Sequence, residues 1–180
     1  MTEVLYHVLS PSDAADFREL RLRGLREAPE AFGSTYEEDA AQPLDVVADR
    51  LRSARHPTGM ATVGAFMDDA LVGVARCIQA THLKARHKAD IYAMYVAPEA
   101  RGQNVGRELL ARLIAEAREW PHVARINLTV VERAVAARRL YAAAGFQEYG
   151  REPDGLRQDE FKDTVLYLTL ELGQPARRSE

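Results

Sequence analysis

The chain has 180 residues, 47% hydrophobic and 28% charged, with a formal net charge of −3. This length suits one domain with a sizeable core, and the charge gives no general reason to expect a nucleic-acid partner. The single cysteine, Cys77, excludes an internal disulfide, and we interpret it as a small buried hydrophobe rather than a nucleophile. We find no membrane-length apolar stretch and no secretory signal pattern, so we expect a cytoplasmic protein without a membrane partner.

Hydrophobic spacing, caps and breakers predict the order strand, two helices, three strands, helix, strand, helix and two strands. At the first helix, Ser10 offers a cap hydroxyl, Pro11 suits the first turn and Asp13 completes a capping box. The polar pair Asp68-Asp69 predicts a hairpin. The predicted strands are 3–9, 60–66, 71–79, 90–96, 125–131, 146–151 and 161–172, the last two joined by a long loop, and the predicted helices begin at 10, 43, 105 and 133.

This order indicates an α/β domain, a mixed sheet with helices on its faces. The chain shows no internal repeat, low-complexity tract or linker. We therefore expect residues 1–173 to form a single domain and residues 174–180 to be a frayed C-terminal end.

The turn between the strand ending at Val96 and the helix beginning at Val105 contains Arg101, Gly102 and Gly106. The first amides of a helix have no partner within it, and glycines let a ligand approach the backbone, so this turn can hold a phosphate. Taken alone, it is equally well explained as a plain strand-to-helix connection. It lacks the lysine of a Walker turn and the glycine spacing of a dinucleotide site, which makes a nucleotide-binding domain a weak alternative.

A second motif decides between these interpretations. The stretch 134–146 contains Leu140-Tyr141 and Gly145-Phe146, and together with the turn over 95–110 it resembles the GCN5-related N-acetyltransferase (GNAT) superfamily. Both motifs occur in the family's order and separation, and residues 17–38 are similar to a bacterial GNAT subgroup. The resemblance implies the GNAT fold, a mixed, mostly antiparallel sheet of about seven strands flanked by about four helices.

Two positions depart from the family pattern. Asn104 stands where the family usually has glycine, and asparagine is among the few residues that tolerate a left-handed backbone, so the turn should survive at a small conformational cost. Ala134 stands where the second motif usually has asparagine, which removes a side-chain hydrogen bond. Asn127, on the preceding strand, is no obvious replacement.

The resemblance implies that acetyl-CoA lies between two splayed parallel strands. One of these strands would pair its backbone with the pantetheine arm, and the glycine-containing turn would wrap the pyrophosphate. For the strand side chains core packing is a compatible interpretation, and for Arg107 a solvated helix position is nearly as good. The cofactor-binding residues implied are Met94, Tyr95, Val96, Arg101, Gly102, Gln103, Asn104, Val105, Gly106 and Arg107.

Tyr141 matches the family's tyrosine near the thioester sulfur, as hydrogen-bond donor or general acid to the leaving thiolate. A tyrosine titrates near about 10 and a thiol near about 8.5, so we favour the hydrogen bond over full proton transfer. The attacking amine also needs a base. Asp90, Glu37 and Glu38 are candidates, although we favour solvated surface carboxylates for all three. His82 and His87 lack metal-ligand spacing and are expected to be exposed, and no metal is implied.

The sequence therefore predicts a GNAT acetyltransferase that moves an acetyl group from acetyl-CoA to a primary amine by direct attack. The alternative is a module of the same fold that binds acyl-CoA and senses it without turnover. The acceptor could be a small molecule or a peptide. Family members often form homodimers, which makes a homodimer a candidate assembly.

Overall fold

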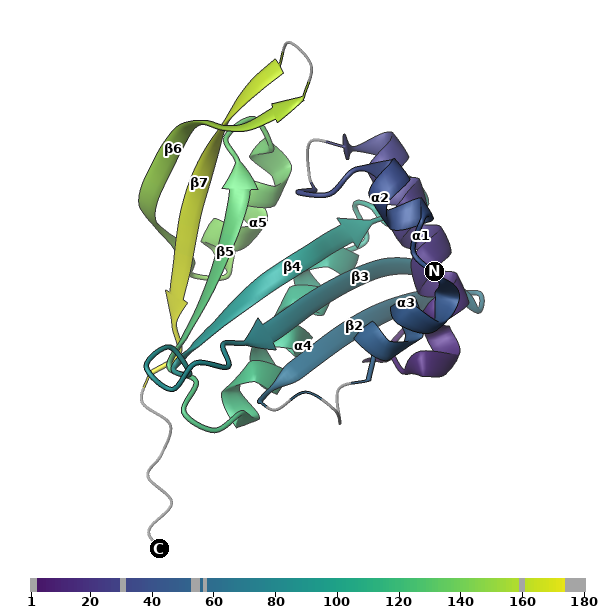
Figure 1. Ribbon diagram of the computed structural model, residues 1–180, viewed down its shortest axis with the longest axis horizontal. Coiled ribbons are helices and arrows are strands. Elements are labelled where there is room, and N and C mark those ends of the chain that lie inside the picture. Colours follow the sequence, from purple (N-terminus) through teal and green to yellow (C-terminus); the bar gives the residue numbers. More distant parts are fainter. Residues whose placement is uncertain (1–2, 30–31, 53–55, 57, 159–160, 174–180) are drawn as a thin grey trace, which may run out of the picture.

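The computed structural model describes residues 3–29, 32–52, 56, 58–158 and 161–173. In these residues one seven-stranded sheet has the order β1-β2-β3-β4-β5-β7-β6 (Figure 1). Every neighbouring pair is antiparallel except β4 with β5, which is parallel, so the predicted mixed sheet is confirmed. The strands are β1 (Val4–Val8), β2 (Met60–Met67), β3 (Ala70–Gln79), β4 (Lys88–Val96), β5 (Arg125–Val131), β6 (Gln147–Gln158) and β7 (Phe161–Glu171).

Helices cover both faces of the sheet. In Figure 1, α4 lies behind β2, β3 and β4, and α3 lies in front. None of the helices in the described ranges has both the length and the apolar character needed to cross a membrane. The helices are α1 (Ala14–Glu27), which follows a short 3-10 turn (Pro11–Asp13), α2 (Tyr36–Ala40), α3 (Leu44–Arg50), α4 (Val105–Glu119) and α5 (Val135–Ala143).

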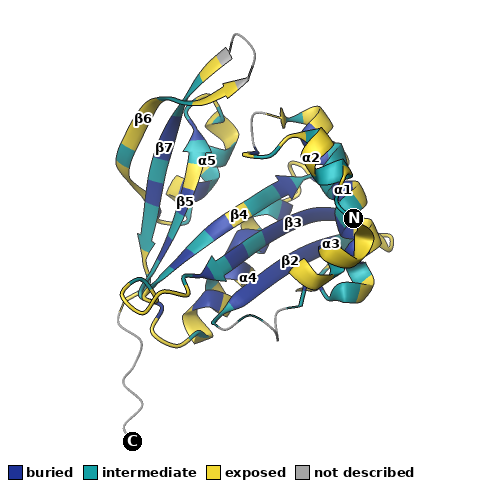
Figure 2. Ribbon diagram, viewed as in Figure 1, coloured by how far each residue is buried: buried dark blue, intermediate teal, exposed yellow. Residues whose placement is uncertain are grey.

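The core lies between the sheet and its helices, and Figure 2 shows β2 and β3 buried along most of their length. Apolar residues at helical spacing form the inner face of α4, because Val105, Leu109, Leu113 and Ala117 are all at most 1% exposed. Burying a leucine contributes about 1.5–3 kcal/mol, so this face fixes α4 firmly on the sheet. The beginning of α4 is therefore held at a defined place beside β4.

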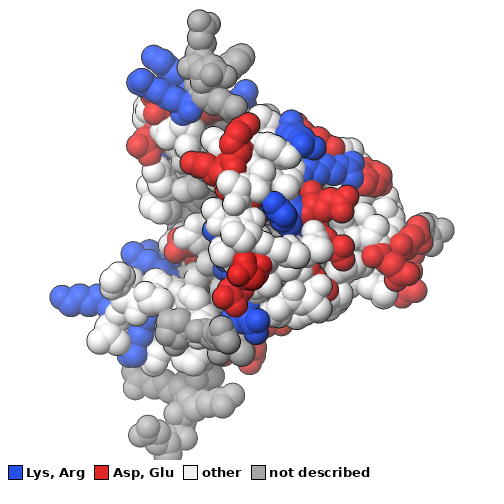
Figure 3. Space-filling view, turned by 45° about the vertical axis from the view of Figure 1, so that its right-hand side comes forward, with Lys and Arg blue, Asp and Glu red and all other residues white. Residues whose placement is uncertain are grey.

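The predicted capping box and the predicted hairpin turn both form. The amide of Ser10 donates to Asp13 Oδ2 at 2.7 Å, which completes the capping box before α1. Asp68 and Asp69 adopt φ angles of 49° and 63°, which a two-residue hairpin turn with the twist of its strands requires. On the face shown in Figure 3, acidic and basic side chains are interspersed and neither sign forms a continuous patch.

Two sequence predictions were wrong. Helix α2 was not expected, although Thr35 and Glu38 form a capping box at its start. The long loop before β7 is also absent, because β6 continues to Gln158 and absorbs Pro153 and Gly155 in a register shift between Glu152 and Leu156. The predicted frayed end, residues 174–180, lies outside the described residues.

The sheet splits at β4 and β5. These two strands pair only where Lys88–Asp90 faces Arg125–Asn127. Beyond this point Ala93 has a φ of 51°, and the register between β3 and β4 shifts. An irregularity of this kind bends a strand. From Ile91 onward, β4 therefore has no strand partner on its β5 side within the described ranges, and its backbone faces a gap.

Candidate active site

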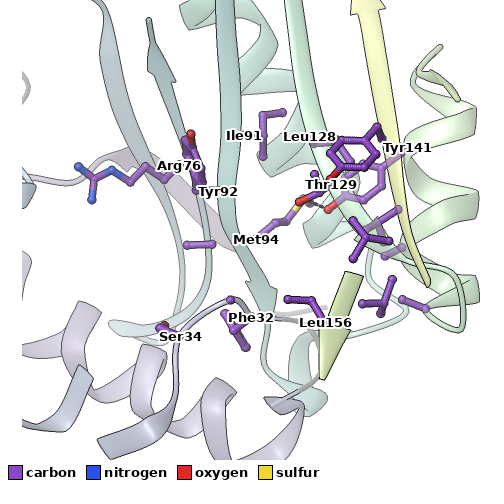
Figure 4. Close-up of a pocket in the computed structure, with 18 of the residues that line it drawn as sticks. Phe32, Ser34, Arg76, Ile91, Tyr92, Met94, Leu128, Thr129, Tyr141 and Leu156 are labelled. Carbon is purple, nitrogen blue, oxygen red and sulfur yellow. Dashed lines mark hydrogen bonds between the residues drawn. The ribbon is translucent and has the colours of Figure 1, made fainter. Parts of the chain in front are cut away.

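The gap between β4 and β5 continues as a cleft with a volume of about 630 Å³. This volume is typical of a small-molecule site. Its walls come from distant parts of the chain, with Met94 on β4, Thr129 on β5, Tyr141 on α5, Leu156 on β6 and Phe32 in the segment between α1 and α2 (Figure 4).

Tyr141 and Met94 meet inside this cleft. The Tyr141 hydroxyl donates to Met94 Sδ at 3.6 Å, and Figure 4 shows the two side chains pointing toward each other. The tyrosine is 7% exposed, and its ring packs edge-on against Phe146 with centroids 5.9 Å apart. Burial raises the pKa of Tyr141 to about 12. The phenol therefore stays protonated at neutral pH and can donate a hydrogen bond in the cleft.

The glycine-containing turn comes close to Met94, a residue of the cleft wall, at Gly106. A Cβ placed there would lie 3.5 Å from Leu140, 3.7 Å from Met94 and 3.7 Å from Val96, which are ordinary contact distances. The protein therefore leaves room for a methyl group at Gly106. Because β4 and α5 both come this close, the two sequence motifs converge at the beginning of α4.

Asn104 adopts the left-handed conformation that its position demands. It is the N-cap of α4 with φ 62° and makes no side-chain cap hydrogen bond, so the first-turn amides of the helix keep no cap partner. Gly102 has φ 74° with nothing within 4 Å of an added Cβ. Arg101 and Gln103 brace the turn, since Arg101 Nε donates to the Val96 carbonyl at 2.9 Å and Gln103 Nε2 to the Glu99 carbonyl at 2.9 Å.

A family model described as "Acetyltransferase (GNAT) family" matches residues 22–146. The chain belongs to the GNAT acetyltransferase family. The resemblance of the two motifs is thereby confirmed on most of the chain, and the GNAT architecture agrees with the split sheet described above.

Solved structures share this GNAT fold. A GNAT-family acetyltransferase from Streptococcus pneumoniae has a TM-score of 0.83 at 21% identity, covering 94% of this chain and 100% of that one. The putative acetyltransferase yncA from Salmonella typhimurium, solved with its cofactor acetyl-CoA, has 0.82 at 20% identity over 99% of both chains. A phosphinothricin acetyltransferase from Sinorhizobium meliloti in complex with AcCoA has 0.79 at 16% identity, covering 96% of this chain and 90% of that one.

The GNAT site residues predicted from the sequence do not all lie in the cleft. Met94 and Tyr141 line the cleft. None of the described turn residues over 101–107 lines it, although an added Cβ at Gly106 would lie 3.7 Å from Met94. The side chain of Val105 is buried in the core, so only its backbone can face a ligand. Tyr95 also points away, because its hydroxyl donates to Glu27 Oε2 at 2.5 Å on α1. Its burial and this carboxylate raise the pKa of Tyr95 to about 12.

None of the three candidate bases lines the GNAT cleft. Asp90 is hydrogen-bonded to Asn127 across the β4–β5 pair, and its burial raises its pKa. Asn127 also accepts from Thr169 at 2.9 Å, so it does not replace the missing asparagine. Glu38 caps α2 and Glu37 is exposed.

His82 and His87 do not line the cleft. His82 and His87 are exposed, as predicted. Across the described ranges, no group of three or more His, Cys, Asp or Glu side chains is arranged to hold a metal ion.

Four charged side chains that line the GNAT cleft were not predicted from the sequence. They are Arg21 on α1, Arg50 on α3, Arg76 on β3 and Glu152 on β6. One signal was visible in the sequence: Arg76 interrupts an otherwise apolar strand, and a charged residue in such a run is rarely buried without a purpose. Ala134 also lines the cleft at the N-cap of α5, without a side-chain cap.

Proposed function

We propose that this GNAT acetyltransferase transfers the acetyl group of acetyl-CoA to a primary amine by direct attack. The observation that carries the proposal is the Tyr141 hydroxyl, 3.6 Å from Met94 Sδ in the gap between two diverging parallel strands. Acetyl-CoA in the Salmonella typhimurium and Sinorhizobium meliloti structures supports this co-substrate.

The residues around the gap suit each part of acetyl-CoA. The open first-turn amides of α4, with Gly102 and Gly106, would hold the pyrophosphate against backbone N–H groups and the positive end of the helix dipole. The unpaired edge of β4 over 91–96 offers backbone groups to the pantetheine amides, as an exposed strand does to an added strand. The thioester would then lie near Tyr141.

The reaction needs few protein groups. The neutral amine attacks the thioester carbonyl carbon, the carbon–sulfur bond breaks, and coenzyme A leaves as a thiolate. The proton of the attacking nitrogen passes to solvent water, since none of the three candidate bases lines the cleft. Tyr141, with its pKa near 12, would donate a hydrogen bond to the sulfur as charge develops. Full proton transfer to a thiolate of pKa about 8.5 would be uphill by about 5 kcal/mol, so hydrogen-bond donation is the better role. No covalent enzyme intermediate is required, and Cys77 is fully buried.

Coenzyme A binding and thiol release test the proposal. Calorimetry with coenzyme A measures binding, and release of free thiol from acetyl-CoA across a panel of primary amines measures transfer. Cys77 is the one cysteine of the chain and is buried, so it adds little background to a thiol assay. We expect amine-dependent thiol release. A protein that binds coenzyme A but consumes no acetyl-CoA with any amine would instead be an acyl-CoA sensor.

A further inference from the structure

The charged groups of the cleft are unevenly distributed. Three arginines line the end formed by the N-terminal helices and β3, namely Arg21, Arg50 and Arg76. The acidic residue among the lining side chains is Glu152 on β6, which accepts a hydrogen bond from Tyr167 and lies on the opposite side of β4 in the strand order. One end of the cleft is therefore strongly basic.

Two of these arginines share one acidic partner, Asp39. Asp39 accepts from Arg21 Nε at 2.9 Å, and its other oxygen lies 3.8 Å from Arg50 Nη1. Ser34 completes this group by accepting from Arg21 at 2.8 Å. Three positive charges against one negative charge leave an excess of two at this end of the cleft.

Arg76 has no acidic partner in the described part of the chain. Its Nη2 donates to the Arg50 carbonyl at 3.0 Å and approaches Met60 Sδ at 3.1 Å, while its buried Nε has no hydrogen-bond partner there. Burial and the charges of Arg50 and Arg21 lower the pKa of Arg76, although a guanidinium stays protonated at any pH the protein meets. A partly buried charge without an acidic partner is costly, so Arg76 is poorly explained by stability alone.

We propose that the acceptor is a primary amine carrying a carboxylate or phosphate group at its far end, and that Arg76, with Arg50, binds this anion. This inference rests on the proposed acetyl transfer. Figure 4 shows Arg76 extending away from the Tyr141–Met94 pair, beyond Tyr92. The amine would sit at Tyr141 and the anion across Tyr92, which requires several bonds between the two groups. Guanidinium groups match both anions with paired hydrogen bonds.

Matched pairs of amines test the proposal. With coenzyme A bound, calorimetry measures the affinity for 6-aminohexanoate against hexylamine and for 4-aminobutyrate against butylamine. Phosphoethanolamine against ethanolamine distinguishes phosphate from carboxylate. We expect the wild-type protein to favour the anionic member of at least one pair by about 10-fold to 100-fold, the range for hydrogen bonds to a charged group. Equal affinity within every pair, or no binding of any amine, would overturn the proposal.

Arg76→Met removes the guanidinium and keeps an unbranched side chain. We expect the preference for the anionic amine to disappear, with coenzyme A affinity unchanged. The melting temperature should equal or exceed that of the wild type, because a partly buried charge repelled by Arg50 and Arg21 is gone. Arg50→Gln, at a half-exposed position, should reduce the preference partially and is a second variant if Arg76→Met does not fold. Arg112→Met is the control, since Arg112 pairs with Glu108 and lies over Tyr6 away from the cleft.

The two proposals fail differently. A wild-type protein that binds coenzyme A but transfers no acetyl group would count against the proposed acetyl transfer, while the pairwise affinities remain measurable. A preference for the anionic amine that survives Arg76→Met would refute the anion site. A large drop in melting temperature in the same variant would then assign Arg76 a structural role.

Discussion

The hydroxyl of Tyr141 can be removed without disturbing the ring, which packs edge-on against Phe146. In Tyr141→Phe we expect kcat to fall about 10-fold to 100-fold, because a hydrogen bond to developing charge contributes about 1.5–3 kcal/mol. Coenzyme A affinity should change less than about twofold, since the contact matters only as the sulfur leaves. Steady-state kinetics and calorimetry measure both quantities, and unchanged turnover would remove the assigned role.

The raised pKa of Tyr141 also links stability to pH. The folded value is about 12 and the unfolded value about 10, so the native state keeps a proton that the unfolded chain releases in this window. The stabilising contribution is complete below about pH 10 and is lost as the pH rises toward 12. We expect the free energy of unfolding of Tyr141→Phe to fall less steeply there, by up to about 1.4 kcal/mol per pH unit.

Urea unfolding at several alkaline pH values measures this slope. Tyr149→Phe is the control, because Tyr149 is 61% exposed. Its slope should match that of the wild type. Equal slopes for the wild type and Tyr141→Phe would show that Tyr141 titrates normally in the folded protein.

The two glycines of the turn serve different purposes: Gly106 leaves space for a ligand, and Gly102 allows a positive φ angle. An alanine at Gly106 meets only ordinary contacts, and alanine favours the helix, so Gly106→Ala should be at least as stable as the wild type. Its methyl group would occupy the space next to Met94, and we expect coenzyme A affinity to drop at least about 10-fold. Gly102→Ala should instead lower stability, because φ is 74° there. Thermal unfolding and calorimetry distinguish these outcomes, and a Gly106→Ala protein with normal affinity would contradict the phosphate-binding role.

At the scale of elements, α1 is seated tightly on β4. A Cβ at Gly24 would lie 3.0 Å from the Phe32 ring and 3.1 Å from the Tyr95 ring. Gly24→Ala must therefore shift the rings of Phe32 and Tyr95 slightly, and Phe32 lines the cleft. We expect it to raise the acceptor KM and lower the melting temperature, with coenzyme A affinity kept, because overpacking costs about 1–3 kcal/mol. Glu19→Ala, at an exposed position of the same helix that does not line the cleft, is the matched control. Equal KM values for the two variants would show that the α1 contact does not shape the acceptor side.

The sequence predicts most elements because their signals are local. The spacing of Val105, Leu109 and Leu113 fixes the inner face of α4, and the residues around Ser10 and Pro11 fix the start of the first helix. Helix α2 was missed because five residues carry too little periodicity, even with a capping box. The strand β6 was cut short because Pro153 and the glycine that follows it indicate a loop in sequence but form an irregularity in a strand.

Residues of the candidate site could be predicted only where they belong to a sequence motif. Tyr141 and the turn at Gly106 could be placed because each belongs to a short recognisable stretch. The arginine group could not, because Arg21, Arg50 and Arg76 lie on three elements and meet only when α1 and α3 fold over β3. A charge within an apolar strand marks one member of such a group, but spacing along the chain does not reveal its neighbours.

At the scale of the molecule, the unpaired edge of β4 makes ligand binding visible as backbone protection. We expect coenzyme A to slow hydrogen exchange over residues 91–96 and in the turn before α4, while β1 and β2, already paired, change little. At 100 times its Kd the ligand should stabilise the fold by about 2.7 kcal/mol, which raises the melting temperature by roughly 5–11 °C. Exchange mass spectrometry and a thermal scan measure these effects, and uniform protection would argue against binding along β4.

The split between β4 and β5 also coincides with a division of the chain. Within the described ranges, residues before 120 supply four strands and four helices, and residues after 124 supply β5, α5, β6 and β7. The link between them is held by Gln79, whose Nε2 donates to the Pro121 carbonyl at 2.6 Å. A chain interrupted at His122 would give two fragments, each with contiguous strands. We expect the two fragments to reassociate. Coenzyme A would contact both of them, so it should strengthen their association in place of the missing peptide link.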